Sequence, residues 1–439
     1  MLYFNYQHAL SAKNSQIKTT SYIMKKSINI LLLVVLGACS KDYFKRAESP
    51  IRETQSNNVS LSDVRYYVHH VKGVSETKSS EVSISPIISV KDTVLYLVTY
   101  EDGWELLSAD RRAPRTFAKA DHGRITVEDI TSIPALSMLY ENCVNNISFL
   151  KAHPYFESKN SFFELWDVAF PSDKLESSSR IVSRSGDFEI TQNHLLQTKW
   201  GQGHPWNIRA PYTSSNLSEH CLTGCGPVAI AQYLYYLNTE EGLDYSPYSD
   251  SQTLKYIPND ESYVTLNSGD VFFYSGGGSV WSTMPLDSLC TNQSFAAVST
   301  FMIDIGMATQ SQYGIGSTFT YANMVSLAFM SYFHISVDQE STDFDTLSSL
   351  IIEDNNPAIV LIGYRNGMNN WVYGHFVVAD AMKEVYQNNQ LTGRYVGFNW
   401  GWDGSCDNLW INTDTINWTI NGTTFNSIAC VYYILSNSL

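Results

Sequence analysis

The chain has 439 residues, of which 44% are hydrophobic and only 16% carry a charged side chain. That length is enough for two ordinary domains, and an aromatic content of 13% favours a well-packed, β-rich protein over a disordered one. The net charge is −15, and the body of the chain has no cluster of lysine and arginine. Because nucleic-acid binding needs a basic face, this balance argues against a nucleic-acid partner.

The N-terminal segment is typical of an export signal. The run MKKSINILLLVVLGACS, residues 24–40, has a basic start, an apolar stretch too short for a comfortable membrane span, and small residues before a cysteine. Its LGAC ending resembles a bacterial lipobox, so we expect Cys39 to carry a lipid that is the protein's only contact with the membrane. An ordinary signal peptide is the alternative. Since Met24 begins a complete signal by itself, we expect residues 1–23 to be an over-extended start.

The first half of the chain reads as α+β. Residues 94–129 predict a strand, a turn at Asp102-Gly103, a second strand, a loop and another short strand. Residues 133–150 carry an apolar stripe with helical spacing. This half shows no evident catalytic cluster.

The two halves meet in a serine-rich stretch, DKLESSSRIVSRSGDFEITQNH, at residues 173–194. Serines and isolated arginines predict an exposed segment that is open to proteolytic nicking. The stretch is either a plain interdomain linker or an activation site, and the choice depends on the function of the second half.

The second half opens with two cysteines ahead of an apolar run, CLTGCGPVAIAQYLYYL. Proline in the first turn and apolar residues nearly all round predict a central, buried helix that starts at Cys225. The macrodipole and free N–H groups of a helix N-terminus lower the pKa of a thiol, and the thiolate is the reactive form. Cys225 is therefore the candidate nucleophile, whereas Cys221 lies outside the helix and is expected to be structural.

The other cysteines give little sign of a disulfide framework. Without Cys39, six cysteines remain: Cys143, Cys221, Cys225, Cys290, Cys406 and Cys430. The compartment beyond the inner membrane permits disulfides, but a free thiol at Cys225 would leave five cysteines, which cannot all pair. The spacings do not resemble a zinc site.

A thiolate needs an oriented base, and His375 in GHFVVADA is the candidate. Alternation along this strand places three residues on each face: His375, Val377 and Ala379 on one, and Phe376, Val378 and Asp380 on the other. A turn near residues 388–389 would fold the next strand back and bring Asn399 close to His375. The Asn399 oxygen could then fix the imidazole tautomer, and Trp400 could shield that hydrogen bond from water. The alternatives are a structural histidine and, for NWGW, a bulged aromatic edge with glycines at tight bends.

A fourth element lies upstream, in TKWGQGHPWN. The side-chain amide of Gln202, together with the backbone N–H of Cys225, would form an oxyanion hole. A glutamine in a loop is otherwise most often solvent-facing.

Taken in chain order, these stretches resemble the streptopain family of bacterial papain-like cysteine peptidases, which includes interpain-type enzymes. Gln202 in WGQGHPWN, Cys225 in GCGPVAIAQ, His375 in GHFVVADA and Asn399-Trp400 in NWGWDG match the order of the family's motifs. Gly226-Pro227 departs from the commonest form of its nucleophile motif. The stretch YLVTYEDGWELLSADRRAPRTFAKADHG resembles the family's propeptide.

The resemblance implies a papain-like fold, with the nucleophile helix on one side and a sheet carrying His375 and Asn399 on the other. It implies a zymogen whose first half inhibits the cleft intramolecularly until it is cut away. It also implies hydrolysis of polypeptide substrates that have a hydrophobic side chain next to the cleaved residue, on its N-terminal side. No cofactor or metal ion is required. We expect an exported envelope lipoprotein whose mature domain can be released when it is cut away from Cys39.

The expected fold class is α+β, a papain-like catalytic domain preceded by a smaller α+β pro-domain. The expected boundaries are 1–39 for the over-extended start and signal, 40–60 for a tether, 61–172 for the pro-domain, 173–194 for the activation linker and 195–439 for the catalytic domain.

Two other functions fit parts of the sequence. One is a papain-like hydrolase of peptidoglycan stem peptides, although such domains are usually shorter and lack a long pro-region. The other is an inactive binding or inhibitory lipoprotein, against which the complete set of Cys225, His375, Asn399 and Gln202 argues.

Overall fold

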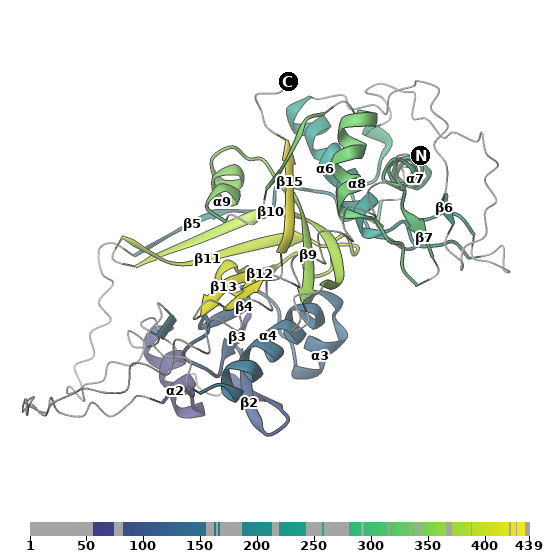
Figure 1. Cartoon of the computed structure of the whole chain (residues 1–439). Helices are drawn as coiled ribbons and strands as arrows, with labels where there is room; N and C mark the ends of the chain where they lie inside the picture. Colours follow the sequence, from purple (N-terminus) through teal and green to yellow (C-terminus); the bar gives the residue numbers. More distant parts are fainter. Residues whose placement is uncertain are drawn as a thin grey trace, which may run out of the picture. The chain divides into compact units, whose positions relative to one another are not determined.

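The computed structural model of the chain describes most residues after the predicted leader (Figure 1). The described residues are 56–73, 82–154, 162–163, 166, 187–212, 219–242, 257–258, 281–290, 294–314, 316–333, 335–340, 344–365, 371–387, 389–420, 423–426 and 428–434. The predicted signal and Cys39 lie outside them. No helix within these ranges is both long enough and apolar enough to cross a membrane.

A large antiparallel sheet organises the described residues (Figure 1). Its strands are β1 (Ser83–Ser89), β2 (Asp92–Thr99), β3 (Trp104–Ser108), β4 (Thr116–Ala120), β5 (Phe188–Gln192), β8 (Val337–Glu340), β9 (Ala358–Arg365), β10 (Trp371–Gln387), β11 (Gln390–Asn399), β12 (Leu409–Asn412) and β15 (Ile428–Ile434). They are ordered β1-β2-β3-β4-β12-β11-β10-β9-β15-β8, and β5 pairs with β10 outside this path. Because β4 pairs with β12, strands from the two halves of the chain form one continuous sheet.

The first half folds largely as its sequence predicts. The turn at Asp102-Gly103 joins β2 to β3, and Gly103 has a φ of +88°, a conformation that glycine adopts without strain. The predicted helix over 133–150 is α4 (Pro134–Ala152), preceded by the short α3 (Val127–Ser132). Thr126 caps α3 in a capping box with Asp129, which fixes where this helix begins.

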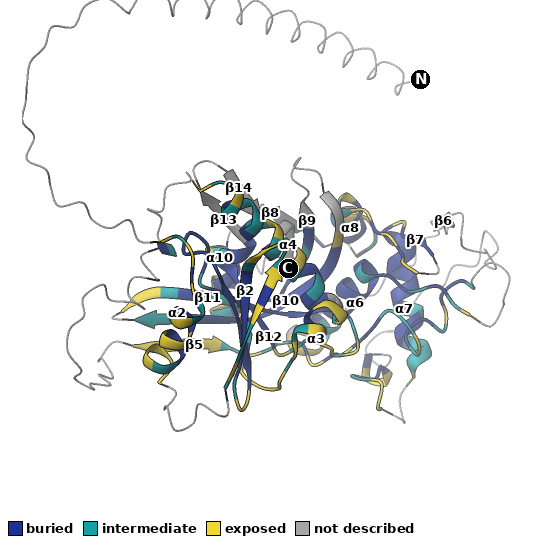
Figure 2. Ribbon diagram, turned by 90° about the horizontal axis from the view of Figure 1, so that it is seen from below, coloured by how far each residue is buried: buried dark blue, intermediate teal, exposed yellow. Residues whose placement is uncertain are grey.

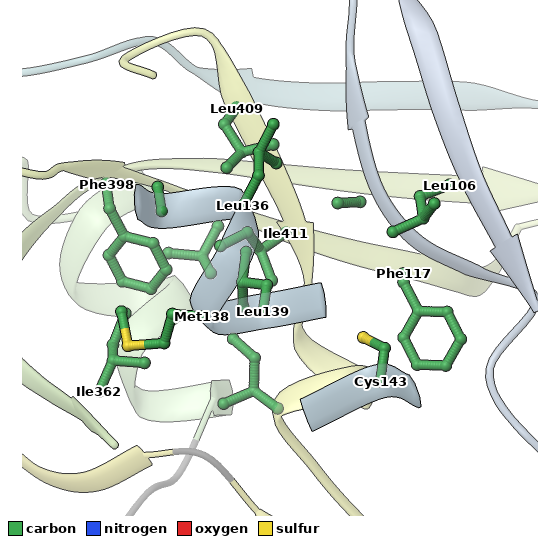
Figure 3. Packing of buried hydrophobic residues seen from close by; sticks show 14 of the residues in the cluster. Leu106, Phe117, Leu136, Met138, Leu139, Cys143, Ile362, Phe398, Leu409 and Ile411 are labelled. Atoms are coloured by element: carbon green, nitrogen blue, oxygen red, sulfur yellow. The ribbon is translucent and has the colours of Figure 1, made fainter. Parts of the chain in front are cut away.

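One face of the sheet shares a hydrophobic core with α4. The residues Leu136, Met138, Leu139 and Cys143 of α4 belong to the same buried cluster as Val377, Val396, Phe398, Leu409 and Ile411 of the C-terminal strands. Figure 3 shows the α4 side chains lying against Phe398, Leu409 and Ile411. The predicted pro-domain and catalytic domain are therefore not two separate cores, because burial of α4 depends on strands from the other half.

The opposite face of the sheet packs against helices of the second half. These are α6 (Cys225–Glu241), α7 (Phe295–Ala308) and α8 (Ala322–Ala328), and residues of all three lie in one buried cluster with β10. Strand β10 alternates as predicted, since Val377 and Ala379 enter the α4 cluster whereas Phe376 and Val378 enter the α6 cluster. Figure 2 shows β10 as largely buried. The predicted α+β arrangement, with the nucleophile helix against an antiparallel sheet, is confirmed.

The remaining elements are short. They are α2 (Leu61–Tyr66), α9 (Phe344–Ile352), α10 (Thr413–Ile416), the π-helical turns Tyr67–Val71 and Phe329–Phe333, the 3₁₀ turn Trp281–Thr283, and the strands β6 (Ile257–Pro258), β7 (Gln312–Tyr313), β13 (Asn417–Ile420) and β14 (Thr423–Asn426).

The predicted linker at 173–194 contains a β-strand. Residues 173–186 lie outside the described ranges, but Phe188–Gln192 form β5, which pairs antiparallel with Met382–Tyr386 of β10. Its side chains are mostly exposed, whereas its backbone is held in the sheet. An irregular segment was expected here, and the cross-strand stacking of Phe188 on Tyr386 at 4.5 Å helps to explain the strand instead.

Candidate active site

The candidate nucleophile Cys225 is the first residue of α6. Gly224 precedes it with a φ of +95°, and a Cβ there would lie 2.8 Å from the Thr318 side chain, so the turn into the helix requires glycine. The helix is buried nearly all round, as predicted, which fixes the position of its first residue. The Cys225 side chain is half-buried at this helix end.

The Cys225 sulfur lies beside the strand that carries His375. Burial raises the pKa of the thiol, while the backbone N–H groups of Phe376, Gly226 and Cys225 itself act in the opposite direction. The net shift is upward, contrary to the lowering that we expected from the helix N-terminus. The physical reason is that protein atoms surround the half-buried sulfur, and the resulting loss of solvation disfavours the thiolate more than the N–H groups stabilise it.

His375 is buried in β10, only 8% exposed. Its Nε2 lies 2.8 Å from the backbone oxygen of Trp400. A carbonyl oxygen can only accept, so Nε2 must carry the proton and the neutral ring keeps Nδ1 as its basic nitrogen. Burial lowers the pKa of His375 to about 4, although the Trp400 carbonyl opposes that shift.

The Cys225 sulfur and His375 are related through the backbone of strand β10, without a direct bond between the two side chains. The backbone N–H of Phe376, the residue after His375, acts on the Cys225 sulfur. Both side chains are among the described residues, and no hydrogen bond joins them there. With the thiol pKa raised and the imidazole pKa lowered, both groups are uncharged at neutral pH.

Asn399 does not take the predicted position against His375. It pairs with Val378 in the hairpin, and its side-chain amide bonds elsewhere: Nδ2 donates to the Thr198 oxygen at 2.7 Å. Its Oδ1 accepts from Gln232 Nε2 at 2.9 Å and from the Gly401 N–H at 3.1 Å. The orienting bond to His375 therefore comes from the next residue's carbonyl, because the hairpin register turns the Asn399 side chain toward α6.

Trp400 also differs from its predicted role, since its ring is fully buried but is not the one nearest to His375. The ring stacked directly on His375 belongs to Trp402, with centroids 4.3 Å apart. The Trp400 ring is farther from the imidazole, with centroids 6.3 Å apart, and its centroid lies 5.6 Å from that of Trp402. The sequence analysis missed Trp402, although the repeated tryptophan in NWGW was a usable signal. Gly401 between them has a φ of +67°, and a Cβ would lie 2.9 Å from Val228 of α6.

The loop that carries Gln202 lies against the residues preceding Cys225. The Gln202 carbonyl accepts from the backbone N–H of Thr223 at 2.9 Å and from its hydroxyl at 3.2 Å. The Gln202 side chain is half-buried, and its amide makes no hydrogen bond to another described residue. The structure thus brings Gln202 to the start of α6 and leaves its amide free.

A second contact holds this loop to the NWGWDG stretch. The indole N–H of Trp206 donates to the Asp403 carboxylate. Trp206 is fully buried, and Asp403 lies just beyond the ring stacked on His375. The two sequence motifs therefore act as one structural unit, which the sequence analysis treated separately.

The remaining cysteines fit structural roles. Cys221 is fully buried in a small cluster with Ala210, Ile303, Met307 and Tyr313, and burial raises the pKa of its thiol. The five cysteines whose side chains are described, Cys143, Cys221, Cys225, Cys290 and Cys406, are all free thiols. Over the same described residues, no group of three histidine, cysteine or acidic side chains could hold a metal ion.

The region that contains this site matches a known family. Residues 200–410 match the model of the Peptidase C10 family, which confirms the predicted resemblance to the streptopain family. The protein is a cysteine-type endopeptidase. No curated relative matches the chain.

Two solved structures from Prevotella intermedia are similar to the chain. A fragment of prointerpain A has 16% sequence identity and a TM-score of 0.48, over 80% of this chain and 98% of that one. Active wild-type interpain A cysteine protease has 21% identity and a TM-score of 0.38, over 55% of this chain and 94% of that one.

Proposed function

We propose that the chain is the zymogen of an exported cysteine endopeptidase, with Cys225 as nucleophile and His375 as general base and acid. The observation that carries the proposal is the position of the Cys225 sulfur. It lies at a helix N-terminus and next to the backbone N–H of Phe376, the residue after His375. Nucleophilic acyl transfer needs a positioned thiol and an oriented imidazole that can reach each other.

The proposed reaction follows from the tautomer of His375. Its Nδ1 takes the Cys225 proton, and the thiolate attacks the substrate carbonyl carbon. The Gln202 amide and the Cys225 backbone N–H donate to the oxyanion. The protonated Nδ1 then gives its proton to the departing amine, leaving a thioester. A water molecule gives a proton to Nδ1 and attacks the thioester, which releases the acid and the Cys225 thiolate. The protonated Nδ1 then returns its proton to the sulfur and restores the thiol.

The surroundings of His375 support this role. The Trp400 carbonyl, 2.8 Å from Nε2, stabilises the imidazolium that forms during the reaction. The Trp402 ring covers one face of the imidazole and keeps water away from it.

The extent of shared structure supports intramolecular inhibition by residues 61–172. Strand β4 adds to the edge of the C-terminal sheet at β12, and α4 packs on the face of β10 that holds Val377 and Ala379. Asp121, which follows β4, also pairs with the buried Lys383 of β10 at 2.7 Å. A first half anchored in this way can hold the strand of His375 until it is removed.

Cleavage that separates the halves is favoured upstream of β5. The backbone of Phe188–Gln192 is paired with β10, and a protease needs an extended, unpaired segment in its cleft. Within the predicted window of about 175–198, we therefore place the cut before Asp187, in the serine-rich sequence that is expected to be open to nicking. We propose that the mature chain keeps β5.

The proposed location is the cell envelope. The LGAC sequence before Ser40 favours a lipid on Cys39, and removal of the pro-region would detach the peptidase from that lipid. A Cys39→Ser variant would then lose radiolabelled fatty acid and leave the membrane fraction, whereas a variant that keeps both contradicts the lipid anchor.

Expression of wild type beside Cys225→Ala tests the function. We expect wild type to yield a shorter form that cleaves a fluorogenic peptide with an apolar residue next to the cleaved one, on its N-terminal side. The variant should accumulate as an uncut and inactive precursor. N-terminal sequencing of the mature form locates the cut. Normal turnover by Cys225→Ala would disprove the proposed function. If Cys225→Ala is inactive but still matures normally, only the idea of self-cleavage is disproved.

A further inference from the structure

Two buried side-chain amides, Gln232 of α6 and Asn399 of β11, are hydrogen-bonded to each other near the proposed catalytic residues. Gln232 is fully buried and Asn399 is 4% exposed. Gln232 follows Cys225 by seven residues on α6, which is two helical turns and about 10 Å along the same face. Neither amide touches the reacting atoms of the proposed mechanism, so their link to it must be indirect.

The hydrogen bonds of these amides leave no ambiguity in their orientation. Gln232 Oε1 accepts the Trp200 backbone N–H at 3.2 Å, and Asn399 Nδ2 donates to the Thr198 carbonyl at 2.7 Å. The remaining ends then meet as donor and acceptor, Gln232 Nε2 to Asn399 Oδ1 at 2.9 Å. Because backbone groups fix both outer ends, flipping either amide would place like groups together.

The amide pair joins three segments that are far apart in the sequence. Residues 198–200 lead directly to Gln202, which supplies the proposed oxyanion donor. Residues 399–401 contain Trp400, whose carbonyl holds His375, and the Gly401 N–H bonds the same Asn399 oxygen at 3.1 Å. The third segment is α6, which begins at Cys225.

We propose that Gln232 is a positioning residue of the peptidase. Its amide fixes two groups relative to helix α6. One is the loop that carries Gln202, and the other is the Trp400 carbonyl that bonds His375. The proposal rests on the function proposed above and deepens it, because it names what aligns the three parts of that site. Misplacement of a catalytic group by about 1 Å can cost about 100-fold in rate, so a buried clamp of this kind should affect turnover.

The variant Gln232→Glu separates alignment from simple packing. Glutamate has the same shape and still accepts from Trp200, but its second oxygen would face the Asn399 oxygen without a proton between them. Burial and this contact both raise the carboxyl pKa above its usual range. As the pH falls, the protonated carboxyl donates to Asn399 and restores the original pattern of hydrogen bonds. The other titratable side chains that line the adjoining cavity are Tyr235, Tyr236 and Glu240.

The experiment uses the full chain, allowed to mature, with active sites counted by an epoxide inhibitor of cysteine peptidases. The variants are Gln232→Glu, Gln232→Met and Asn399→Asp, and Gln197→Glu is the matched control, since Gln197 is exposed on the same stretch. The rate per active site and KM are measured from pH 5 to 8 and divided by the wild-type values. This ratio removes the pH dependence of Cys225 and His375 themselves. Melting temperatures are recorded at each pH.

We expect kcat of Gln232→Glu to fall about tenfold at pH 8, the effect of losing one buried hydrogen bond, and to recover toward wild type at pH 5, with KM unchanged. The kcat of Gln232→Met should be reduced at every pH, and the kcat of Gln197→Glu should match that of wild type. If Gln232→Glu yields no active sites, Asn399→Asp offers the same test. The second carboxylate oxygen of this aspartate would face the Thr198 carbonyl, and in acid it would become protonated and donate to that carbonyl.

Two results would overturn the proposal. One is a Gln232→Glu enzyme whose kcat per active site equals that of wild type at every pH, even if its melting temperature falls. The other is a loss that acid does not reverse in either carboxylate variant. Both are distinct from failure of the proposed function, which would appear as activity that survives Cys225→Ala in an otherwise wild-type chain.

Discussion

The imidazole of His375 donates from Nε2 to the backbone oxygen of Trp400, 2.8 Å away. This bond assigns the neutral tautomer, because a carbonyl accepts and never donates. It leaves Nδ1 as the basic nitrogen and gives a main-chain group the orienting role that we expected of an asparagine side chain. Every amino acid keeps its backbone carbonyl, so the role of this bond must be tested through the residues around it.

Substitution of the two neighbouring cysteines separates the nucleophile from a packing residue. We expect Cys225→Ala to lose at least about 10⁴-fold of the peptidase activity, since no other described group can form the acyl intermediate in its place. Cys221→Ala should keep most of the activity and lose about 1 kcal/mol of stability, because it only removes a buried sulfur. A peptide assay and thermal melts measure both effects. The opposite ranking would identify Cys221 as the reactive thiol.

Gln202→Ala tests the oxyanion donor. The loop carbonyl of Gln202 is held by Thr223, so the backbone should stay in place when the side chain is removed. Loss of one donor to the oxyanion typically lowers kcat by about 10²–10³ with little change in KM. Steady-state kinetics on the matured enzyme measure kcat and KM of the variant. If kcat stays within about twofold of wild type, Gln202 does not stabilise the oxyanion.

Trp402 is predicted to position His375 through stacking. With ring centroids 4.3 Å apart, removal of the indole in Trp402→Ala would free one face of the imidazole and admit water. We expect kcat to fall at least about tenfold, a typical effect for loss of an aromatic contact and its shielding. Trp402→Phe keeps a ring and should retain more of the activity. A kcat of Trp402→Ala equal to that of wild type would show that the stack has no role in turnover.

The uncut precursor should have an unreactive thiol at neutral pH. Burial raises the pKa of Cys225, and His375, with a pKa of about 4, carries no charge there to stabilise a thiolate. Alkylation of Cys225 by iodoacetamide in the Cys225-intact precursor, read by mass spectrometry, should therefore be slow at pH 6–7 and rise steadily above the usual thiol pKa of about 8.5. Rapid alkylation that is constant between about pH 5 and 8 would show an ion pair already formed.

His194 and Asp380 should stabilise the fold in a pH-dependent manner. Burial lowers the pKa of His194, but the Asp380 carboxylate, 2.8 Å away, and Asp407 outweigh it and hold that pKa above its usual range. Because the folded-state pKa is raised, the stabilisation is fully present below about pH 6.5 and is lost as the pH rises through the raised value.

The variant His194→Gln should therefore lower the melting temperature most near pH 6 and least in alkaline buffer. His122→Gln is the control, since His122 makes an equally short bond to Asp102, but its side chain is 80% exposed. Exposed pairs contribute little, so this control should melt like wild type. A His194→Gln deficit that does not change with pH would assign the effect to packing rather than to charge.

Much of the fold could be predicted because its signals are local. Asp102-Gly103 marks a tight turn, the apolar stripe at 133–150 has the period of a helix, and Gly226-Pro227 lies in the first turn of α6, which begins at Cys225. Alternation along β10 also predicted which side chains face each layer. These features depend on backbone preferences and on spacing, which a single sequence displays.

The partners of the site residues could not be predicted from those signals. A bulge in the β10–β11 pairing and the register that sets Asn399 opposite Val378 decide which polar group reaches His375. Trp402 was missed, and Gln232 was noted only as the end of the GCGPVAIAQ motif. The reason is the same, since their contacts join segments that lie far apart in the chain.

The sequence by itself determined the chemistry available to this protein: a thiol at the start of a buried helix, an imidazole on a strand, and an amide in an upstream loop. Only the tertiary structure decided how these groups are held. It assigned the orienting bond to the Trp400 carbonyl, turned Asn399 toward Gln232, and reversed the expected shift of the Cys225 pKa. The physical reason is that helix and strand propensities act within a few residues, whereas strand register and solvent exclusion are set by packing of the whole sheet.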